Sequence, residues 1–311
     1  MDYYCLAFYK YIPLHNPHEE IRQQKAYLEQ LDAKSRIYIN HEGINGQMSL
    51  RKDHALKYID WMHSKEEFED VHFKLHEWHE HAFPKLTIKY RKQLVALDKW
   101  VDLNNRGTHL PPAEFKKALE SDEPYVLVDV RNDYEWKVGH FEGARLPPCE
   151  TYREFNHYAE NLKDEVDPKN TKVLMYCTGG IRCETYSSLL KEAGFDKVFQ
   201  LEGGIINYGL KEGSQHWRGK LFVFDDRLSV PLSEEKSEIV GKCHFCEAPT
   251  ESYYNCANMD CNCLFLCCTD CLKKNLGTCQ DTCMNAERLR PYSEQNPHKP
   301  FRKAHNYFSK K

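Results

Sequence analysis

One cysteine stands where a strand-like run meets a glycine-rich loop and the start of a helix. The apolar residues 173–176 lead into Cys177, and residues 178–182 separate it from a helix-like segment that begins near Glu184. Backbone N–H groups at a helix N-terminus are unpaired and carry partial positive charge, and glycines allow a loop to turn several of them toward one centre. Such a site stabilises a thiolate, or a small anion bonded to sulfur, and lowers the pKa of the cysteine.

We therefore predict that Cys177 is a nucleophile and that Arg182 stabilises the charge on its sulfur. A buried cysteine before an ordinary turn is the alternative interpretation, but the strand, the two glycines, the arginine and the helix occur together in order. The backbone of the predicted active loop comes from Thr178, Gly179, Gly180 and Ile181.

A second group of residues has the spacing of metal ligands. Ten of the 14 cysteines lie between Cys243 and Cys283, and they include pairs separated by two residues. Tetrahedral Zn²⁺ takes two thiolates from one tight turn, so this pattern predicts two structural four-cysteine zinc sites. Redox pairs and buried thiols are the alternatives. The first predicted set is Cys243, Cys246, Cys268 and Cys271, the second is Cys256, Cys261, Cys279 and Cys283, and Cys263 and Cys267 have no assigned role.

A basic run interleaved with apolar and aromatic residues is a candidate for contact with RNA. Positive residues that alternate along one strand face can follow a phosphate backbone. A solvated strand edge explains the same pattern. The run contains Lys85, Lys89, Arg91 and Lys92, and the C-terminal residues 299–305 repeat its basic and aromatic composition.

The composition is that of a folded protein with several domains. The chain has 311 residues, of which 41% are hydrophobic and 13% aromatic, so two or three domains are expected. Its net charge of −4 does not favour nucleic acid as a partner, although a sum over the chain can hide local patches. There is no apolar run of the ~18 residues that a membrane helix needs and no signal-type N-terminus. We expect a cytoplasmic protein that does not associate with a membrane. Its cysteines are then expected to be metal ligands or catalytic groups rather than to form disulfides.

Residues 1–97 are predicted to form a ferredoxin-like α+β domain. Strand-like runs and helix-like segments follow one another in a β-α-β-β-α-β order. Asn16 and Pro17 are suited to the N-cap and the first turn of the first helix, and residues 42–46 are rich in turn-forming types. The predicted strands are residues 4–11, 35–39, 46–50, 73–75 and 86–90, and the predicted helices are residues 16–31 and 52–63.

The rest of the chain divides into a linker and two further regions. Residues 98–112, with their glycine and prolines, are predicted to be a linker. Strands and helices alternate in residues 113–218, which predicts an α/β domain with a mostly parallel sheet and Cys177 at its carboxyl edge. Residues 219–311 are predicted to be a small cysteine-rich zinc-binding region that ends in a basic tail.

Three sequence signatures in the central region resemble those of the rhodanese family. They are residues 125–144, which include the charged pair Asp129 and Arg131; the cysteine loop; and residues 194–204. In that family the loop N–H groups hold a persulfide on the cysteine, and the resemblance implies a supporting role for Asp129 and Arg131. Related phosphatases place the arginine six positions after the cysteine, whereas Arg182 follows Cys177 by five. The loop is therefore one residue shorter, which favours a bound group of the size of a sulfur atom over phosphate.

Nearly the whole chain is similar to one rhodanese subfamily, the tRNA uridine hydroxylases. The resemblance rests on residues 177–184, on residues 42–46 and on residues 83–86. It implies an oxidoreductase that uses molecular oxygen as co-substrate to hydroxylate C5 of the wobble uridine in the tRNA anticodon, with the loop cysteine required. Two alternatives stay open: a thiosulfate-type sulfurtransferase that forms a persulfide on Cys177, and a non-enzymatic zinc module that binds tRNA.

The chemistry of the cysteine is also open at this point. Cys177 could add to C6 of uracil as a thiolate, which raises the electron density at C5, or it could carry a persulfide that is itself oxidised. The residues contain no dinucleotide-binding fingerprint, so no nucleotide cofactor is expected.

Overall fold

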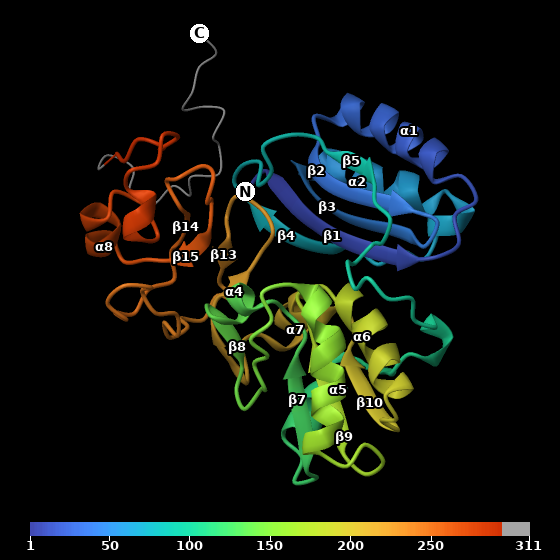
Figure 1. The fold of residues 1–311 in the computed structure, drawn as a ribbon. Helices are drawn as coiled ribbons and strands as arrows, with labels where there is room; N and C mark the ends of the chain where they lie inside the picture. Colours follow the sequence, from blue (N-terminus) through green and yellow to red (C-terminus); the bar gives the residue numbers. More distant parts are fainter. Residues whose placement is uncertain (294–311) are drawn as a thin grey trace. The chain divides into compact units, whose positions relative to one another are not determined.

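The computed structural model describes residues 1–293 (Figure 1). The basic stretch at residues 299–305 lies outside the described residues. The chain divides into two compact units. The first unit comprises Met1–Val126 and Thr151–Lys211, and the second comprises Leu127–Glu150 and the chain from Glu212 onward.

The first unit contains a five-stranded sheet in the order β4-β1-β3-β2-β5. Strand β1 pairs antiparallel with β3 and β4, β2 pairs antiparallel with β3, and β5 is added parallel to β2 at the edge. The prediction of a ferredoxin-like α+β domain is confirmed. The strands are Tyr3–Tyr11 (β1), Lys34–Asn40 (β2), Gly43–Arg51 (β3), Lys74–Trp78 (β4) and Ile88–Tyr90 (β5), and the helices are Pro17–Leu28 (α1) and Lys52–His63 (α2).

Alternation of apolar residues builds the core of this domain. Leu6 and Phe8 of β1 are 2% exposed and face the same side, as period-two strands require. They share one apolar cluster with Leu28 of α1 and with Tyr58 and Met62 of α2. The Asn16 side chain accepts a hydrogen bond from the backbone N–H of Glu19, so the predicted N-cap of α1 is present.

One sequence expectation in this domain is wrong. Residues 42–46, predicted to be a turn-rich connection, lie mostly inside β3, which begins at Gly43. Gly43 pairs with Tyr11 of β1 and with Asn40 of β2, and the pairing continues through Gly46. Hydrogen bonding to two neighbouring strands therefore overrides the local turn preference of these residues.

The central region forms a four-stranded sheet in the order β6-β10-β9-β7. Strand β10 pairs parallel with both β6 and β9, which confirms the predicted parallel sheet. Strand β6 lies in the segment predicted to be a linker, so that prediction is corrected: pairing with β10 makes these residues an edge strand. The elements are Thr108–Leu110 (β6), Pro112–Leu119 (α3), Tyr125–Asp129 (β7), Phe155–Glu165 (α5), Lys172–Tyr176 (β9), Ile181–Glu192 (α6), Lys197–Leu201 (β10) and Gly204–Glu212 (α7).

The second unit is built from short elements. Three antiparallel pairs join β8 to β11, β12 to β13 and β14 to β15. Within residues 1–293, no helix combines the length and the apolar character that a membrane crossing requires. The elements are Asp133–Trp136 (α4), Gly139–Phe141 (β8), Trp217–Gly219 (β11), Leu221–Phe222 (β12), Ser229–Val230 (β13), Tyr253–Asn255 (β14), Leu264–Leu266 (β15) and Thr269–Lys274 (α8).

Candidate active site

Cys177 occupies the loop between the end of β9 and the start of α6. Its side chain is fully buried, and the backbone N–H of Gly180 donates a hydrogen bond to Sγ at 3.1 Å. Cys183, in the first turn of α6, is buried as well and hydrogen-bonds to the Cys177 sulfur. The loop thus surrounds one sulfur atom with donors from its own backbone and from a neighbouring thiol.

These surroundings lower the pKa of Cys177. Burial opposes ionisation, but the hydrogen bond from Cys183 and the charge of Arg182 more than offset it, and backbone N–H groups add to them, so that the pKa falls to about 6. Burial, together with the negative charge on Cys177, raises the pKa of Cys183 well above its usual value. At neutral pH, therefore, Cys177 is a thiolate and Cys183 is the thiol that donates to it.

Two glycines allow the loop to close around the sulfur. Gly180 has φ +101°, and a Cβ atom there would lie 2.8 Å from the hydroxyl oxygen of Tyr9. Gly204 is the first residue of α7 and has φ +69°, and a Cβ atom there would lie 2.5 Å from the carbonyl oxygen of Cys177. The next two N–H groups, of Ile205 and Ile206, donate to the carbonyl oxygens of Cys177 and Thr178 at 2.9 and 3.1 Å. The start of α7 therefore holds the active loop by its backbone.

Arg182 lies at the predicted position beside the loop. Its side chain is largely buried, and one guanidinium nitrogen donates to Oγ1 of Thr178 at 3.4 Å. Its carbonyl oxygen accepts a hydrogen bond from Tyr152 at 2.7 Å, and the same hydroxyl contacts Oγ1 of Thr185 at 2.7 Å. Arg182 thus links the loop residue Thr178 to the first turns of α6 while its charge favours the thiolate.

Lys74 of β4 is a positioning residue that sequence patterns do not single out. Its Nζ donates to the carbonyl oxygen of Gly179 at 2.9 Å, although the two residues are 105 positions apart in the sequence. In a trans peptide the C=O and N–H groups point in opposite directions. Lys74 therefore holds the oxygen of the Gly179–Gly180 peptide, and the N–H of that same peptide points at Sγ of Cys177.

The Lys74 side chain is also an unusual buried charge. It is 4% exposed, and its Nζ lies 5.2 Å from the centre of the Tyr9 ring. Burial lowers the pKa of Lys74 to about 8, although the charges on Cys177, Glu184 and Glu202 oppose that shift. The ammonium group and the Cys177 thiolate therefore favour each other's charged forms.

A second network connects the N-terminal domain to α6. Oε1 of Glu184 accepts a hydrogen bond from the Tyr9 hydroxyl at 2.9 Å and contacts Nε2 of His109 at the same distance. Oε2 pairs with Arg106 at 3.3 Å. Burial opposes ionisation of Glu184, but His109, Arg106 and Tyr9 together lower its pKa. An anionic Glu184 therefore ties β1 and β6 to the helix that starts at the active loop.

The pH dependence of Cys177 reactivity follows from this geometry. Because only the thiolate reacts, we expect the rate of Cys177 alkylation to rise with pH to a midpoint near 6 and then level off. An unperturbed thiol would have its midpoint at about 8.5. Mass spectrometry of the Cys177 peptide after timed iodoacetamide treatment separates this cysteine from the other thirteen. In Arg182→Ala the midpoint should move upward, whereas Arg182→Lys should retain more of the shift; identical midpoints in all three proteins would contradict the role of the arginine charge.

The same measurement tests Lys74. In Lys74→Met, the Gly179–Gly180 peptide loses its partner and the thiolate loses a nearby charge, so we expect a higher alkylation midpoint and a slower plateau rate. Lys74→Arg keeps a donor and a charge and should restore the midpoint. A merely structural role for Lys74 would lower the melting temperature without moving the midpoint, and that outcome would exclude it as a positioning residue.

Asp129 and Arg131 form a buried ion pair in the second unit. Nε and Nη2 of Arg131 donate to the two carboxylate oxygens of Asp129 at 2.8 and 2.6 Å, and both side chains are 0% exposed. Nη2 also donates to the carbonyl oxygen of Gly139 at 2.7 Å. This bidentate pair fixes the chain between β7 and β8.

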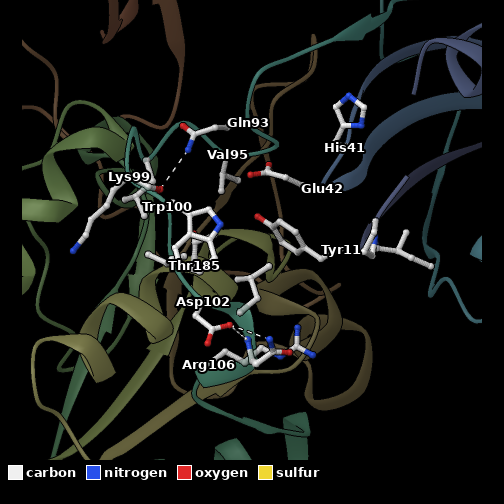
Figure 2. Close-up of a pocket in the computed structure, with 16 residues that line it drawn as sticks. Tyr11, His41, Glu42, Gln93, Val95, Lys99, Trp100, Asp102, Arg106 and Thr185 are labelled. Carbon is white, nitrogen blue, oxygen red and sulfur yellow. Dashed lines mark hydrogen bonds between the residues drawn. The ribbon is translucent and has the colours of Figure 1, made fainter. Parts of the chain in front are cut away.

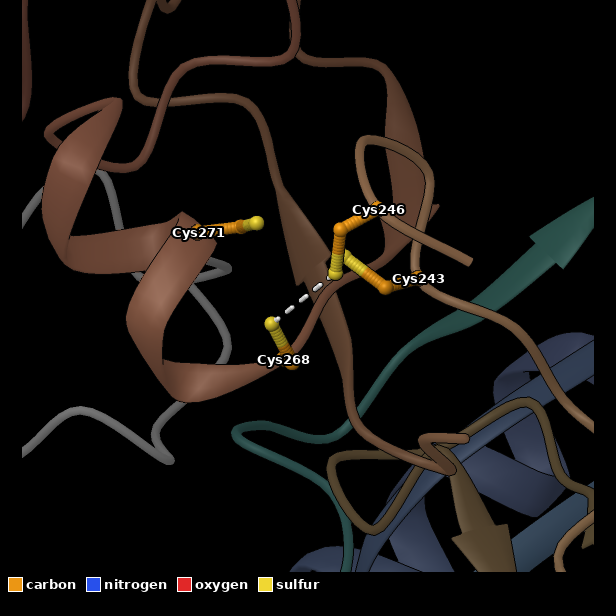
Figure 3. A group of neighbouring side chains, drawn as sticks. All are labelled: Cys243, Cys246, Cys268 and Cys271. Atoms are coloured by element: carbon orange, nitrogen blue, oxygen red, sulfur yellow. Dashed lines mark hydrogen bonds between the residues drawn. The ribbon is translucent and has the colours of Figure 1, made fainter. Parts of the chain in front are cut away.

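The structure assembles the cysteines into the two sets paired from the sequence. Within each set, all sulfur atoms lie within 4.8 Å of one another. Figure 3 shows the four sulfur atoms of the first set pointing toward a common centre; Cys268 and Cys271 come from the start of α8. The sulfurs of Cys246 and Cys268 are 3.7 Å apart, and those of Cys261 and Cys279 in the second set are 3.6 Å apart.

These distances suit zinc. Four sulfurs at about 2.3 Å from a tetrahedral zinc ion lie about 3.8 Å from each other. None of the fourteen cysteines forms a disulfide. Cys263 and Cys267 belong to neither set; Cys263 is exposed and Cys267 is buried. The donor chemistry and the spacing of both sets thus fit a structural metal ion.

The basic run follows the outer strand of the N-terminal sheet. Lys85, Lys89, Arg91 and Lys92 are all exposed, and β5 is the edge strand. The guanidinium carbon of Arg91 lies 4.9 Å from the centre of the Tyr38 ring. Lysines also protect edge strands from pairing with other chains, so exposure alone does not make this edge an RNA-binding surface.

Comparison with protein families agrees with this architecture. Residues 3–94 match the model of the UPF0176 acylphosphatase like domain, residues 111–210 match the rhodanese-like domain, and residues 218–284 match the model described as Rhodanase C-terminal. The fold and the cysteine loop thus define a rhodanese-domain protein with an acylphosphatase-like N-terminal domain.

Curated relatives narrow this class. The tRNA uridine(34) hydroxylase of Protochlamydia amoebophila is 56% identical over 99% of this chain and 96% of its own length. The enzymes of the same name from Chlamydia felis and Chlamydia muridarum are 51% and 50% identical over 98% of this chain and cover 94% and 93% of their own lengths. The chain belongs to the family of tRNA uridine(34) hydroxylases, which are enzymes.

Solved structures of rhodanese-like domains are also similar to part of the chain. A domain from Anabaena sp. is 21% identical and covers 36% of this chain and 78% of its own, with a TM-score of 0.31.

Proposed function

We propose that this protein hydroxylates C5 of uridine 34 in the tRNA anticodon, with molecular oxygen as co-substrate and Cys177 as nucleophile. Two kinds of evidence support the proposal: similarity to tRNA uridine(34) hydroxylases over almost the whole chain, and the buried sulfur of Cys177, which the active loop holds as a thiolate. The hydrogen bond from the Gly180 N–H to Sγ of Cys177 at 3.1 Å is the observation that carries it, because this donor, together with Cys183 and Arg182, lowers the pKa of Cys177 and makes it nucleophilic at neutral pH.

The proposed chemistry uses the thiolate to activate the base. Addition of Cys177 to C6 of uracil raises the electron density at C5, where an oxygen atom from O₂ is then inserted. Two electrons from a reductant convert the other oxygen atom to water, and loss of the sulfur from C6 together with the proton from C5 restores the ring. The N–H of Gly180 and the thiol of Cys183 stabilise the thiolate before addition and after release.

Reconstitution with purified components tests the function. The reaction contains anticodon stem-loop RNA, a thiol reductant and air, and nucleosides are then analysed by mass spectrometry. We expect uridine 34 to gain one oxygen atom, with ¹⁸O from labelled O₂ in the product and no product under nitrogen. Unmodified RNA in the presence of oxygen and active protein would contradict the proposal.

A sulfurtransferase is the second candidate function, and the rhodanese-type loop favours it. The same protein is therefore incubated with thiosulfate and cyanide. Suppose that thiocyanate forms, that its formation requires Cys177 but not oxygen, and that no hydroxylated RNA is found. This alternative would then replace the hydroxylase proposal.

Phosphate contacts along β5 are proposed to bind the RNA. Reversing the charges of Lys89 and Arg91 to glutamate should weaken stem-loop binding by about tenfold or more and reduce its salt dependence. Cys177 alkylation should be unchanged. The matched control reverses the exposed Lys117 and Lys169, which lie outside β5. Equal losses in both double variants, or binding that is independent of salt, would exclude β5 as the RNA-binding edge.

A further inference from the structure

A cavity of about 380 Å³ lies in the first unit between the N-terminal domain and α6. Its wall combines the end of β1, the turn between β2 and β3, and the segment from Gln93 to Arg106. Thr185 of α6, eight positions after Cys177, closes one side. Cys177 is fully buried and does not line the cavity. The cavity is thus next to the active loop but separate from the sulfur.

One buried polar group in this cavity has no partner of its own. The hydroxyl oxygen of Tyr11 is buried and has no hydrogen-bond partner among the described residues. Oε2 of Glu42 accepts hydrogen bonds from Asn40 and from the N–H of Leu94. Figure 2 shows the Tyr11 hydroxyl and the Glu42 carboxylate pointing toward the indole ring of Trp100. A buried hydroxyl without a partner is costly, so this group calls for a ligand with hydrogen-bonding atoms.

The opposite wall suits a planar ring. Trp100 lines the cavity and is nevertheless 78% exposed, an unusual position for the largest apolar side chain. Exposed aromatic rings are the platforms on which single-stranded nucleic acids stack their bases. Two carboxylates, of Glu42 and Asp102, line the cavity and disfavour a phosphate group there. The two cationic side chains of the lining are already paired with carboxylates, Lys99 with Glu192 at 3.4 Å and Arg106 with Glu184 at 3.3 Å. The chemistry therefore selects a base, with donor and acceptor edges, over the charged part of a nucleotide.

The basic edge strand adjoins this cavity. The rings of Tyr90 and of the cavity residue His41 lie 6.4 Å apart, edge to face. Tyr90 is 39% exposed and stands between Lys89 and Arg91 in the sequence. Lys92 is followed directly by Gln93, the first cavity residue of the segment that ends at Arg106. Phosphates bound along β5 would thus bring the attached bases to the mouth of the cavity.

We infer that this cavity binds the base of a nucleotide that flanks the reacting uridine in the single-stranded loop of the RNA. The inference rests on the proposed function. We assign the cavity to a flanking base rather than to the reacting base because Cys177 does not line the cavity. The Tyr9 hydroxyl donates a hydrogen bond to Glu184 of α6, the helix that starts at the active loop. Tyr11, two positions further along β1, faces the cavity. Alternate residues of a strand are about 6.6 Å apart, a distance that one nucleotide can span.

A double-mutant cycle between protein and RNA tests the assignment. Stem-loop RNAs carry an abasic nucleotide on either side of uridine 34, and their affinities are measured for the wild-type protein and for Trp100→Ala. We expect Trp100→Ala to weaken binding of intact RNA about tenfold, as loss of one stacked base does. One of the two abasic RNAs should bind the wild-type protein about as weakly as the intact RNA binds Trp100→Ala. Trp100→Ala should bind that abasic RNA almost as tightly as it binds the intact RNA. Tyr11→Phe, which deletes one oxygen atom, should reproduce this coupling more weakly.

The controls separate the inference from the proposed function. Cys177 alkylation should be the same in Trp100→Ala, Tyr11→Phe and wild type, since neither residue contacts the sulfur. Suppose that wild-type protein hydroxylates the intact RNA, but that the loss of binding free energy from Trp100→Ala adds to the loss from each abasic site. The base then does not occupy the cavity, and the inference is overturned. If wild-type protein neither binds nor hydroxylates intact RNA, the proposed function fails and the inference falls with it.

Discussion

Cys177→Ser should abolish uridine hydroxylation and leave the protein folded. A serine hydroxyl remains protonated at neutral pH, whereas the Cys177 thiol has a pKa of about 6 and is a thiolate. The substitution therefore removes the nucleophile while changing the buried volume little, and we expect turnover to fall by about 10³-fold or more. Turnover of stem-loop RNA, measured at saturating RNA and oxygen, gives the result directly.

A matched substitution excludes damage to the fold. Cys5 is also buried, at 6% exposure, but it lies in β1 and outside the active loop. Cys5→Ser should keep near wild-type turnover, and both variants should melt within a few degrees of the wild type. Near wild-type turnover in Cys177→Ser would remove the cysteine from the mechanism.

Removal of metal should have the second large effect. We expect about two zinc ions per chain, one in each four-cysteine set, and loss of one ion in Cys246→Ser and of the other in Cys261→Ser. Structural zinc sites in small domains contribute apparent binding free energies of about 10–16 kcal/mol at neutral pH, so chelation should unfold the cysteine-rich segment. The core of that segment consists largely of the cysteines themselves, with Tyr254, Phe265 and Leu272.

Elemental analysis and hydrogen exchange check this prediction together. Exchange should become fast in the segment around α8 after chelation while the strands beside Cys177 stay protected, because their core is apolar and independent of the metal. Cys263→Ser, at an exposed cysteine outside both sets, should retain both ions. A metal-free protein that is fully protected in this segment would contradict a structural role for zinc.

Local patterns accounted for the parts of the molecule that are built from nearby residues. The cysteine loop could be recognised because β9, the two glycines and α6 are consecutive. The first cysteine set could be paired from its two C-x2-C spacings, and the second from the wider pairs Cys256/Cys261 and Cys279/Cys283 that alternate with it along the chain. The α+β and parallel-sheet domains were predicted from the order and periodicity of their elements.

Features that depend on distant contacts could not be predicted. Lys74 acts on a peptide 105 positions away, and nothing in its own neighbourhood marks that contact. Strand β6 resembles a linker because a three-residue strand at a sheet edge acquires its structure from β10. Tyr11 and Trp100 face the same cavity only after the chain between them has folded through the whole N-terminal sheet. These positions are fixed by tertiary packing rather than by local propensity.

Analysis of cellular tRNA tests the central claim most directly. Nucleosides from tRNA of a strain that lacks this protein are compared, by mass spectrometry, with those of the same strain supplied with the wild-type protein or with Cys177→Ser. The proposed function predicts that 5-hydroxylated uridine 34 and its derivatives are absent from the deleted strain, return with the wild-type protein and do not return with the variant. Equal amounts of hydroxylated uridine with the variant and with the wild-type protein would contradict it.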